Sequence, residues 1–252
     1  MKTLDFHVHL GTSIFGYGQS LDQLIASLDR LSIDQAVVVP VQPLSYRLEP
    51  ENESVAAAVL KYPNRLHGFC RIDPRQGEAA RSELISCIKV LKLKGLFLHP
   101  WEESCPVNST WVKALMPTVV DLGIPVMIAG GHVRVSMASQ IADLARDFPN
   151  VPMVITSGGQ INISGIALGE ATQLLKEHSN LYLETSGIYR EDFIEDMVPV
   201  IGSERMLFGS NSPEYCQELE LLRPRLAHLD DRHKLNLLSD TAARLLKLTD
   251  AI

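Results

Sequence analysis

The sequence has few of the features expected of a membrane, secreted or nucleic-acid-binding protein. Its 252 residues contain no apolar stretch approaching the ~20 residues of a membrane-spanning helix. The four cysteines form no Cys-x-x-Cys pair, and scattered cysteines in a chain of this size are typical of reduced thiols in a cytoplasmic protein. The formal net charge is −7, so neither a general nucleic-acid partner nor an anionic membrane surface is expected.

Linkers, short-period repeats and low-complexity tracts are also missing, and we therefore expect residues 1–252 to form one domain. A glycine-rich phosphate turn usually follows the first strand of an open doubly wound sheet. Here the first predicted strand runs into His9-Leu10-Gly11-Thr12 instead. This absence favours a barrel over an open sheet.

Apolar runs alternate with amphipathic segments along the whole chain. Runs such as 36–39 and 126–128 are rich in valine, isoleucine and similar residues, which is typical of parallel strands buried on both faces. Eight strands, each followed by a helix, predict an α/β fold with a single (β/α)8 TIM barrel, for which ~250 residues is a usual length. The predicted strands are 3–9, 35–40, 66–72, 94–99, 124–129, 151–156, 180–185 and 205–210.

Two helix starts carry clear capping signals. Ser20 followed by Gln23 matches a capping box, and it predicts a helix from residue 21. Ser212 followed by Pro213 predicts a second cap, with proline at the first helical position.

The segment 5–9, Asp-Phe-His-Val-His, carries the most specific chemical signal. Strand alternation predicts Asp5, His7 and His9 on one face and the intervening apolar residues on the other. Two imidazoles on one face can bind the same ion, and imidazole suits zinc, iron, nickel or copper. Taken alone, the motif also fits a strand with two polar histidines in the core.

Motifs in the same order follow the predicted strands: 5–9 for the first, 68–74 for the third, 94–100 for the fourth, 124–131 for the fifth, 154–159 for the sixth, 180–187 for the seventh and 205–213 for the eighth. With these motifs the sequence resembles the amidohydrolase superfamily, in particular its branch of small barrels that includes decarboxylases and lactonases. The resemblance covers nearly the whole chain. It implies a hydrolase or decarboxylase that acts on a small carboxylated or lactone-type molecule.

The resemblance also implies metal ligands and a general base at the strand ends, and most of these positions are altered. The fourth-strand position often held by lysine or a carboxylate is Phe97, the fifth-strand histidine is Ala129, the sixth-strand histidine is Thr156, and the eighth-strand aspartate is Asn211. An amide cannot take a proton from a metal-bound water, so a binuclear hydrolase is not expected.

At most one divalent metal, with zinc as the first candidate, is expected on His7 and His9. His132 follows Gly130-Gly131 and could swing over the position of Ala129 as a further ligand, or it could be an exposed residue at a helix start. His99 is either a ligand or a hydrogen-bonding residue of the pocket wall. Asn211 stands at the catalytic position. The predicted substrate-binding residues are Arg71, Phe97, His99, Ala129, Thr156 and Ser186.

Several alternatives stay open from the sequence. Arg71 could bind a substrate carboxylate or pair with Asp73 or Glu184. Trp101 could stack on a ligand or pack its loop, and the loop 15–18 could be a mobile lid or be held to the rim by its two rings. The partner is expected to be a small molecule, and homo-oligomer formation is open. Three functions stay open. The protein is a metal-dependent hydrolase or decarboxylase, a lactonase that needs no metal, or an inactive barrel that binds a small molecule without metal.

Overall fold

The computed structural model describes residues 2–159, 165–188, 190 and 192–248. The strands are β1 (Leu4–Thr12), β2 (Gly18–Gln19), β3 (Gln35–Pro40), β4 (Leu66–Arg71), β5 (Gly95–Leu98), β6 (Val126–Ile128), β7 (Met153–Ile155), β8 (Leu181–Glu184) and β9 (Met206–Leu207). The helices are α1 (Leu21–Leu31), α2 (Glu49–Lys61), α3 (Glu78–Lys89), α4 (Thr110–Leu122), α5 (Ala138–Asp147), α6 (Gly165–Glu177), α7 (Phe193–Ile201), α8 (Gln217–Leu226), α9 (Asp231–Leu235) and α10 (Thr241–Leu245). Short helical turns are η1 (Pro74–Gln76), η2 (Thr156–Gly159), η3 (Ser203–Arg205) and η4 (Asn236–Asp240).

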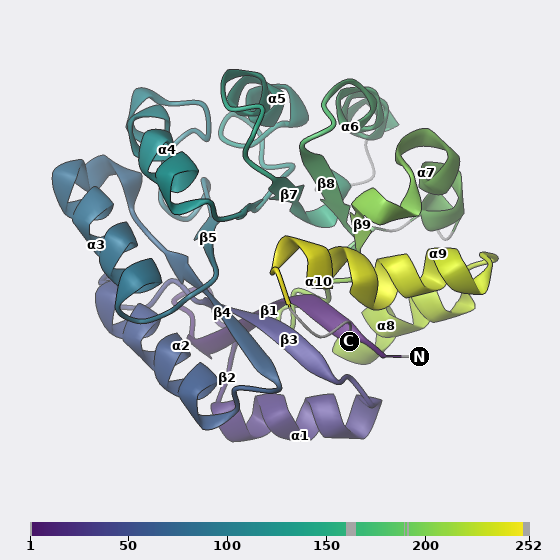
Figure 1. The fold of residues 1–252 in the computed structure, drawn as a ribbon, viewed down its shortest axis with the longest axis horizontal. Coiled ribbons are helices and arrows are strands. Elements are labelled where there is room, and N and C mark those ends of the chain that lie inside the picture. The colour runs from purple at the N-terminus through teal and green to yellow at the C-terminus, as the bar shows by residue number, and fades with distance from the viewer. Residues whose placement is uncertain (1, 160–164, 189, 191, 249–252) are drawn as a thin grey trace.

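The strands form one curled sheet of nine strands in the order β2-β1-β3-β4-β5-β6-β7-β8-β9. Every pairing is parallel except that of β2 with β1, which is an antiparallel hairpin. The amide of Phe6 donates to the carbonyl of Phe208 (2.8 Å) and the amide of His9 to that of Ser212 (2.7 Å), so the chain after β9 lies alongside β1. Figure 1 shows the strands in the middle and the helices around them. All eight predicted strands are present, and the sequence did not predict β2.

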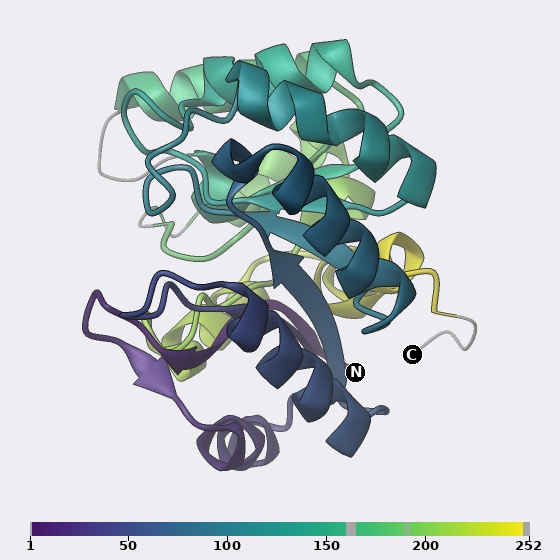
Figure 2. The same cartoon turned by 90° about the vertical axis from the view of Figure 1, so that its left-hand side faces the viewer.

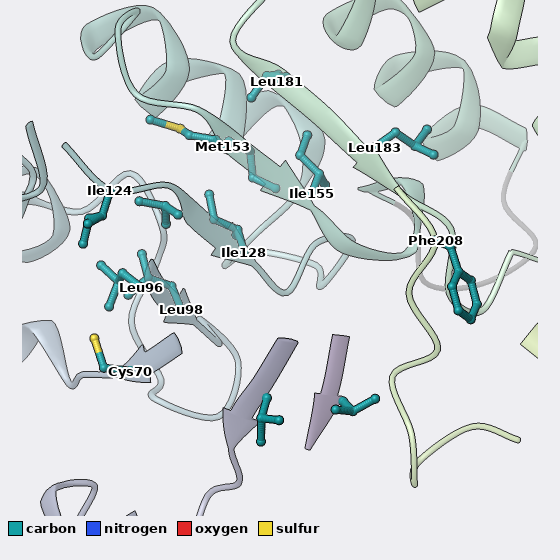
Figure 3. Packing of buried hydrophobic residues seen from close by; sticks show 14 of the residues in the cluster. Cys70, Leu96, Leu98, Ile124, Ile128, Met153, Ile155, Leu181, Leu183 and Phe208 are labelled. Carbon is teal, nitrogen blue, oxygen red and sulfur yellow. The ribbon is translucent and has the colours of Figure 1, made fainter. Parts of the chain in front are cut away.

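Buried apolar residues fall into two layers on the two faces of the sheet. The larger layer lies between strands and helices and includes Leu96, Ile128, Ile155 and Leu183 (Figure 3). In Figure 2 the helices α2, α3 and α4 lie outside the strands. The larger apolar layer packs these helices against the strands. The smaller layer contains inward residues such as Phe97 together with apolar residues of α10. Continuous apolar strands are therefore explained by burial on both faces.

Strand β1 departs from the predicted alternation because it contains a β-bulge. Asp5 pairs with Ala36 and Val8 with Val38, so three steps along β1 match two steps along β3. One extra residue reverses the facing of everything that follows it. Accordingly Phe6 belongs to the inner layer and Val8 to the outer one. The prediction that Asp5, His7 and His9 share a face was wrong for Asp5.

The buried carboxylate of Asp5 instead connects β1 to the last strand and to α8. It accepts hydrogen bonds from the amide of Ser210 (2.9 Å), the amide of His7 (3.2 Å) and the side chain of Gln217 (2.9 Å). Burial raises the pKa of Asp5 to about 6, and these hydrogen bonds limit the rise. Asp5 thus supports the histidine strand from behind.

The two capping predictions had different outcomes. Ser20 caps α1, and Ser20 and Gln23 make both hydrogen bonds of a capping box. The helix predicted from Pro213 begins only at Gln217, because the amides of Glu214 and Tyr215 first bond to the carbonyl of Asn211 in a turn. Within the described residues, no helix combines the length and apolarity needed to cross a membrane.

Candidate functional site

A cavity of about 360 Å³ opens where the carboxyl ends of the strands meet. Parallel barrels place their chemistry at this end, because the loops that follow the strands gather there. Six of the predicted site residues line it: His7, His99, Ala129, His132, Thr156 and Asn211. The cavity is also lined by Phe15, Gly16, Tyr17, Trp101, Glu102, Gly130, Ser157, Glu214 and Tyr215.

Four other predicted residues lie behind this lining. His9 is buried and contacts three residues of the lining, namely Asn211, His7 and Tyr17. Phe97 is buried with its ring centroid 5.5 Å from that of His7. Ser186 is buried and donates its hydroxyl and its amide to Glu184 (2.8 Å each). Arg71 is buried completely. These residues act on the cavity through their neighbours.

Asn211 is held by two contacts that determine its orientation. Its Nδ2 donates to Oε2 of Glu214 (3.0 Å), so its Oδ1 faces Nε2 of His9 (2.7 Å). Because an amide oxygen only accepts, Nε2 of His9 must carry the proton of that imidazole. Burial, the largest cause, holds the pKa of His9 well below its usual value. His9 is therefore a neutral donor to Asn211.

His7 faces the cavity with a buried carboxylate behind it. Oε2 of Glu184 lies 3.8 Å from Nδ1 of His7, beyond hydrogen-bond range. In the part of the chain that the structure describes, neither ring nitrogen of His7 has a hydrogen-bond partner. Burial lowers the pKa of His7 to about 3, so the ring is neutral at pH 7. A polar ring buried in this state is unusual outside functional sites.

Glu184 ends β8 and is a candidate functional residue that the sequence analysis did not name in this role. Its Oε2 also accepts from the amide of Ser157 (3.1 Å), and a Cβ at Gly209 would collide with its Oε1. Burial raises the pKa of Glu184 to about 7, although the hydrogen bonds from Ser186 and Ser157 oppose the rise. The available signal was its position, because a carboxylate at the carboxyl end of a barrel strand is a catalytic candidate.

Arg71 does not point into the cavity, nor does it pair with either carboxylate considered from the sequence. Its Nε lies 2.5 Å from Oε1 of Glu103 and its terminal nitrogen 2.6 Å from Oε2 of Glu102. Glu103 also accepts from the amide of His99 (2.7 Å), so the ion pair holds the loop after β5. The guanidinium lies over the ring of Phe97, 5.7 Å from its centroid. The positive charge of Arg71 is already neutralised by Glu102 and Glu103, so it is not available to bind a ligand.

The rim of the cavity is aromatic and tied together. The ring centroids of Phe15 and Trp101 lie 5.1 Å apart, and the ring of His132 is stacked on Trp101 at 5.8 Å and 14°. Tyr17 donates its hydroxyl to Oε1 of Glu102 (3.3 Å). The loop 15–18 is thus held to the loop after β5 by both of its rings.

His99 and Thr156 place hydrogen-bond donors on the cavity wall. The amide of Glu102 donates to Nδ1 of His99 (3.3 Å), which leaves the proton of the neutral ring on Nε2. The amide of Gly130 donates to the hydroxyl oxygen of Thr156 (3.2 Å), which leaves the hydroxyl proton available. Burial is the largest cause that holds the pKa of His99 well below its usual value.

Of the predicted metal ligands, His7 and His9 lie next to each other with ring centroids 5.0 Å apart, whereas His132 contacts Trp101 and His99. Across the described residues, no group of three or more His, Cys, Asp or Glu side chains is arranged to hold a metal ion. His132 is stacked on Trp101, 5.2 Å from the ring of His99, and burial lowers its pKa to about 4. The assignment of His7, His9 and His132 as metal ligands therefore stays a prediction. In the described structure the ring of His132 is stacked on Trp101 and is not turned over Ala129.

The model of the family described as Amidohydrolase matches residues 4–248. The chain belongs to the amidohydrolase family. Among curated proteins, none matches the sequence.

Solved structures share the fold of this amidohydrolase-family chain. They include 2,6-dihydroxybenzoate decarboxylase from Rhizobium, with 14% identity, a TM-score of 0.80 and coverage of 99% of this chain and 100% of that one. Dihydroxybenzoic acid decarboxylase from Polaromonas sp. JS666, with bound manganese and the inhibitor 2-nitroresorcinol, has 16% identity, a TM-score of 0.79 and coverage of 99% and 98%. 5-carboxyvanillate decarboxylase from Sphingomonas paucimobilis has 13% identity, a TM-score of 0.78 and coverage of 98% of this chain and 99% of that one.

The donors of this family member do not fit a bound metal such as the manganese in the Polaromonas structure. An apolar side chain, Ala129, and a hydroxyl, Thr156, stand where the resemblance implies imidazoles. Nε2 of His9 donates its proton to the amide oxygen of Asn211, so this nitrogen has no free lone pair with which to bind a metal. Zinc sites typically need three protein ligands with available lone pairs.

Proposed function

We propose that this amidohydrolase-family protein hydrolyses a small ester or lactone without a bound metal, with His7 as the general base. The observation that carries the proposal is the neutral, unpartnered ring of His7 at the cavity, with Glu184 3.8 Å behind its Nδ1 and no hydrogen bond to either ring nitrogen from the described residues. A base oriented by a second group is a recurrent catalytic arrangement, and such contacts often tighten on substrate binding. We also propose that the curled sheet closes into a (β/α)8 barrel and that the chain forms one domain.

The reaction balances without an additional reagent. Nε2 of His7 takes a proton from water while the water oxygen attacks the carbonyl carbon. His99 through Nε2 and Thr156 through its hydroxyl donate to the carbonyl oxygen as negative charge develops there. The ester C–O bond then breaks, and the leaving oxygen takes the proton back from His7. Ionised Glu184 stabilises the transient imidazolium.

A decarboxylase acting on an aromatic acid, as the names of the structural neighbours suggest, has less support in this cavity. No lysine or arginine is among the described residues that line it, and Arg71 is already paired with Glu102 and Glu103. A substrate carboxylate would therefore be desolvated without a cationic partner. Neutral esters and lactones carry no such cost.

The test is hydrolysis of a panel of lactones and aryl esters by the protein before and after exhaustive treatment with a chelator. We expect turnover that survives chelation. His7→Gln should lower kcat/KM by roughly 10²–10⁴, the usual contribution of a positioned base. His228→Gln, at an exposed position, is the matched control. Turnover that is lost on chelation and restored by manganese or zinc would contradict the proposal.

The pH profile provides a second measurement. Because burial raises the pKa of Glu184 to about 7, kcat/KM should rise with pH through about 7 as this carboxyl ionises. Glu184→Gln should remove that inflection. Ligand binding with no turnover of any ester would instead support a barrel that binds a small molecule without catalysis.

A further inference from the structure

We propose that the cavity selects a positively charged ligand, namely a small organic cation such as an amidinium or ammonium on a flat ring. The inference rests on the proposed function, since it names the class of molecule that the same cavity binds. It differs from one alternative that the sequence left open, in which Arg71 would bind a substrate carboxylate.

The charges around the cavity favour a cation. Glu102 and Glu214 line it, and among the described lining residues there is no lysine or arginine. Arg71 contacts both Glu102 and Glu103, so with both carboxyls ionised this group of three carries one more formal negative charge than positive. Burial raises the pKa of Glu103 to about 7, which is below the pH of 7.5 used for the binding test. Glu214 adds another negative charge beside Asn211 when it is ionised, although burial raises its pKa as well. A cation entering the cavity compensates this excess, whereas an anion increases it.

The aromatic rim provides a surface for the same ligand. The rings of Phe15 and Trp101 are 45% and 50% exposed, although both line the cavity and lie 5.1 Å apart. Tryptophan is the best aromatic partner for a cation, and the attraction grows when the cation is desolvated. The contacts of Trp101 with Phe15 and His132 hold its ring in place, so little order must be gained on binding.

An independent observation, the unpaired ring of His7, indicates that a polar group of the ligand binds at the cavity wall. His7 is 2% exposed and lines the cavity, and its two ring nitrogens have no hydrogen-bond partner in the described part of the chain. Buried polar atoms are nearly always paired in proteins, so an unpaired ring at a cavity wall indicates a ligand contact. The ligand therefore carries a polar, reactive end towards His7 and its cation near Trp101 and the carboxylates.

Three probes of nearly the same shape separate charge from size: benzamidinium, benzamide and benzoate. Binding is measured by calorimetric titration of the intact protein at pH 7.5, up to about 20 mM, because ligands of this size bind in the millimolar range. We expect affinity to fall in the order cation, neutral amide, anion, with at least about tenfold between benzamidinium and benzoate. Added salt should weaken benzamidinium binding more than benzamide binding.

Two variants with matched controls locate the site. Trp101→Ala should weaken benzamidinium binding about five- to tenfold, whereas Trp111→Ala, 49% exposed on α4 and outside the cavity lining, should leave it unchanged. Glu214→Gln keeps an acceptor for Asn211 and should reduce the preference for cation over amide. Glu218→Gln on α8 removes the same charge outside the lining and should not.

Three outcomes overturn the inference: benzoate binding as tightly as benzamidinium, equal effects of Trp101→Ala and Trp111→Ala, or no binding of any probe. Hydrolysis of neutral lactones that depends on His7 would survive each of these results. Conversely, cation-selective binding without any ester turnover would uphold the inference and remove the proposed hydrolysis. The two proposals therefore fail separately.

Discussion

Replacing Glu184 with glutamine should remove a pH-dependent loss of stability that burial of this carboxyl imposes. Burial raises its pKa from 4.5 to about 7 in the folded protein. A raised acid pKa means that the folded state holds the proton more tightly than the unfolded chain. The stability from this group is fully present below pH 4.5 and is lost as pH rises through about 7. At 1.36 kcal/mol per unit the full effect is about 3 kcal/mol, of which roughly 2.5 kcal/mol falls between pH 5 and pH 8.

The assay is urea unfolding of the wild type and of Glu184→Gln at several pH values between 5 and 8. Glutamine cannot reproduce all the hydrogen bonds that Ser157 and Ser186 donate, so the absolute stabilities will differ. The informative quantity is the change of the difference with pH, which should favour the variant by about 2.5 kcal/mol on going from pH 5 to pH 8. Glu53→Gln, exposed on α2, is the control. A difference constant within about 0.5 kcal/mol would refute the reasoning.

Two further substitutions test the contacts around the cavity. Asn211→Asp would place a second carboxylate at the 3.0 Å contact with Glu214, so we expect a loss of about 2 kcal/mol at pH 8 that is smaller at pH 5. Adding Glu214→Gln should recover most of it in urea unfolding, and an unchanged loss in the double variant would contradict the assigned contact. Arg71→Met should cost about 3–5 kcal/mol, because it leaves Glu102 and Glu103 buried without their cation. A thermal or urea midpoint close to that of the wild type would show that the pair does not support the fold.

The site could be predicted from the sequence where a residue follows directly from its strand end. His7, Thr156 and Asn211 line the cavity because the barrel pattern brings all strand ends to one place. Arg71 also stands at a strand end, but its side chain does not line the cavity. It pairs instead with Glu102 and Glu103 of the loop after β5. No local pattern encodes that contact, since it depends on how the loop after β5 packs.

The sequence by itself determined the strands, their parallel order and the missing ligand positions, because apolar periodicity and residue identity are local properties. Only the tertiary structure decided which polar atoms meet. One extra residue in β1 placed the side chains of Asp5 and His7 on opposite faces of the sheet, and the ring of His132 stacks on Trp101. Glu184 lies 3.8 Å from Nδ1 of His7, although the two residues are far apart in the sequence. Such contacts depend on packing between distant segments, which periodicity cannot report.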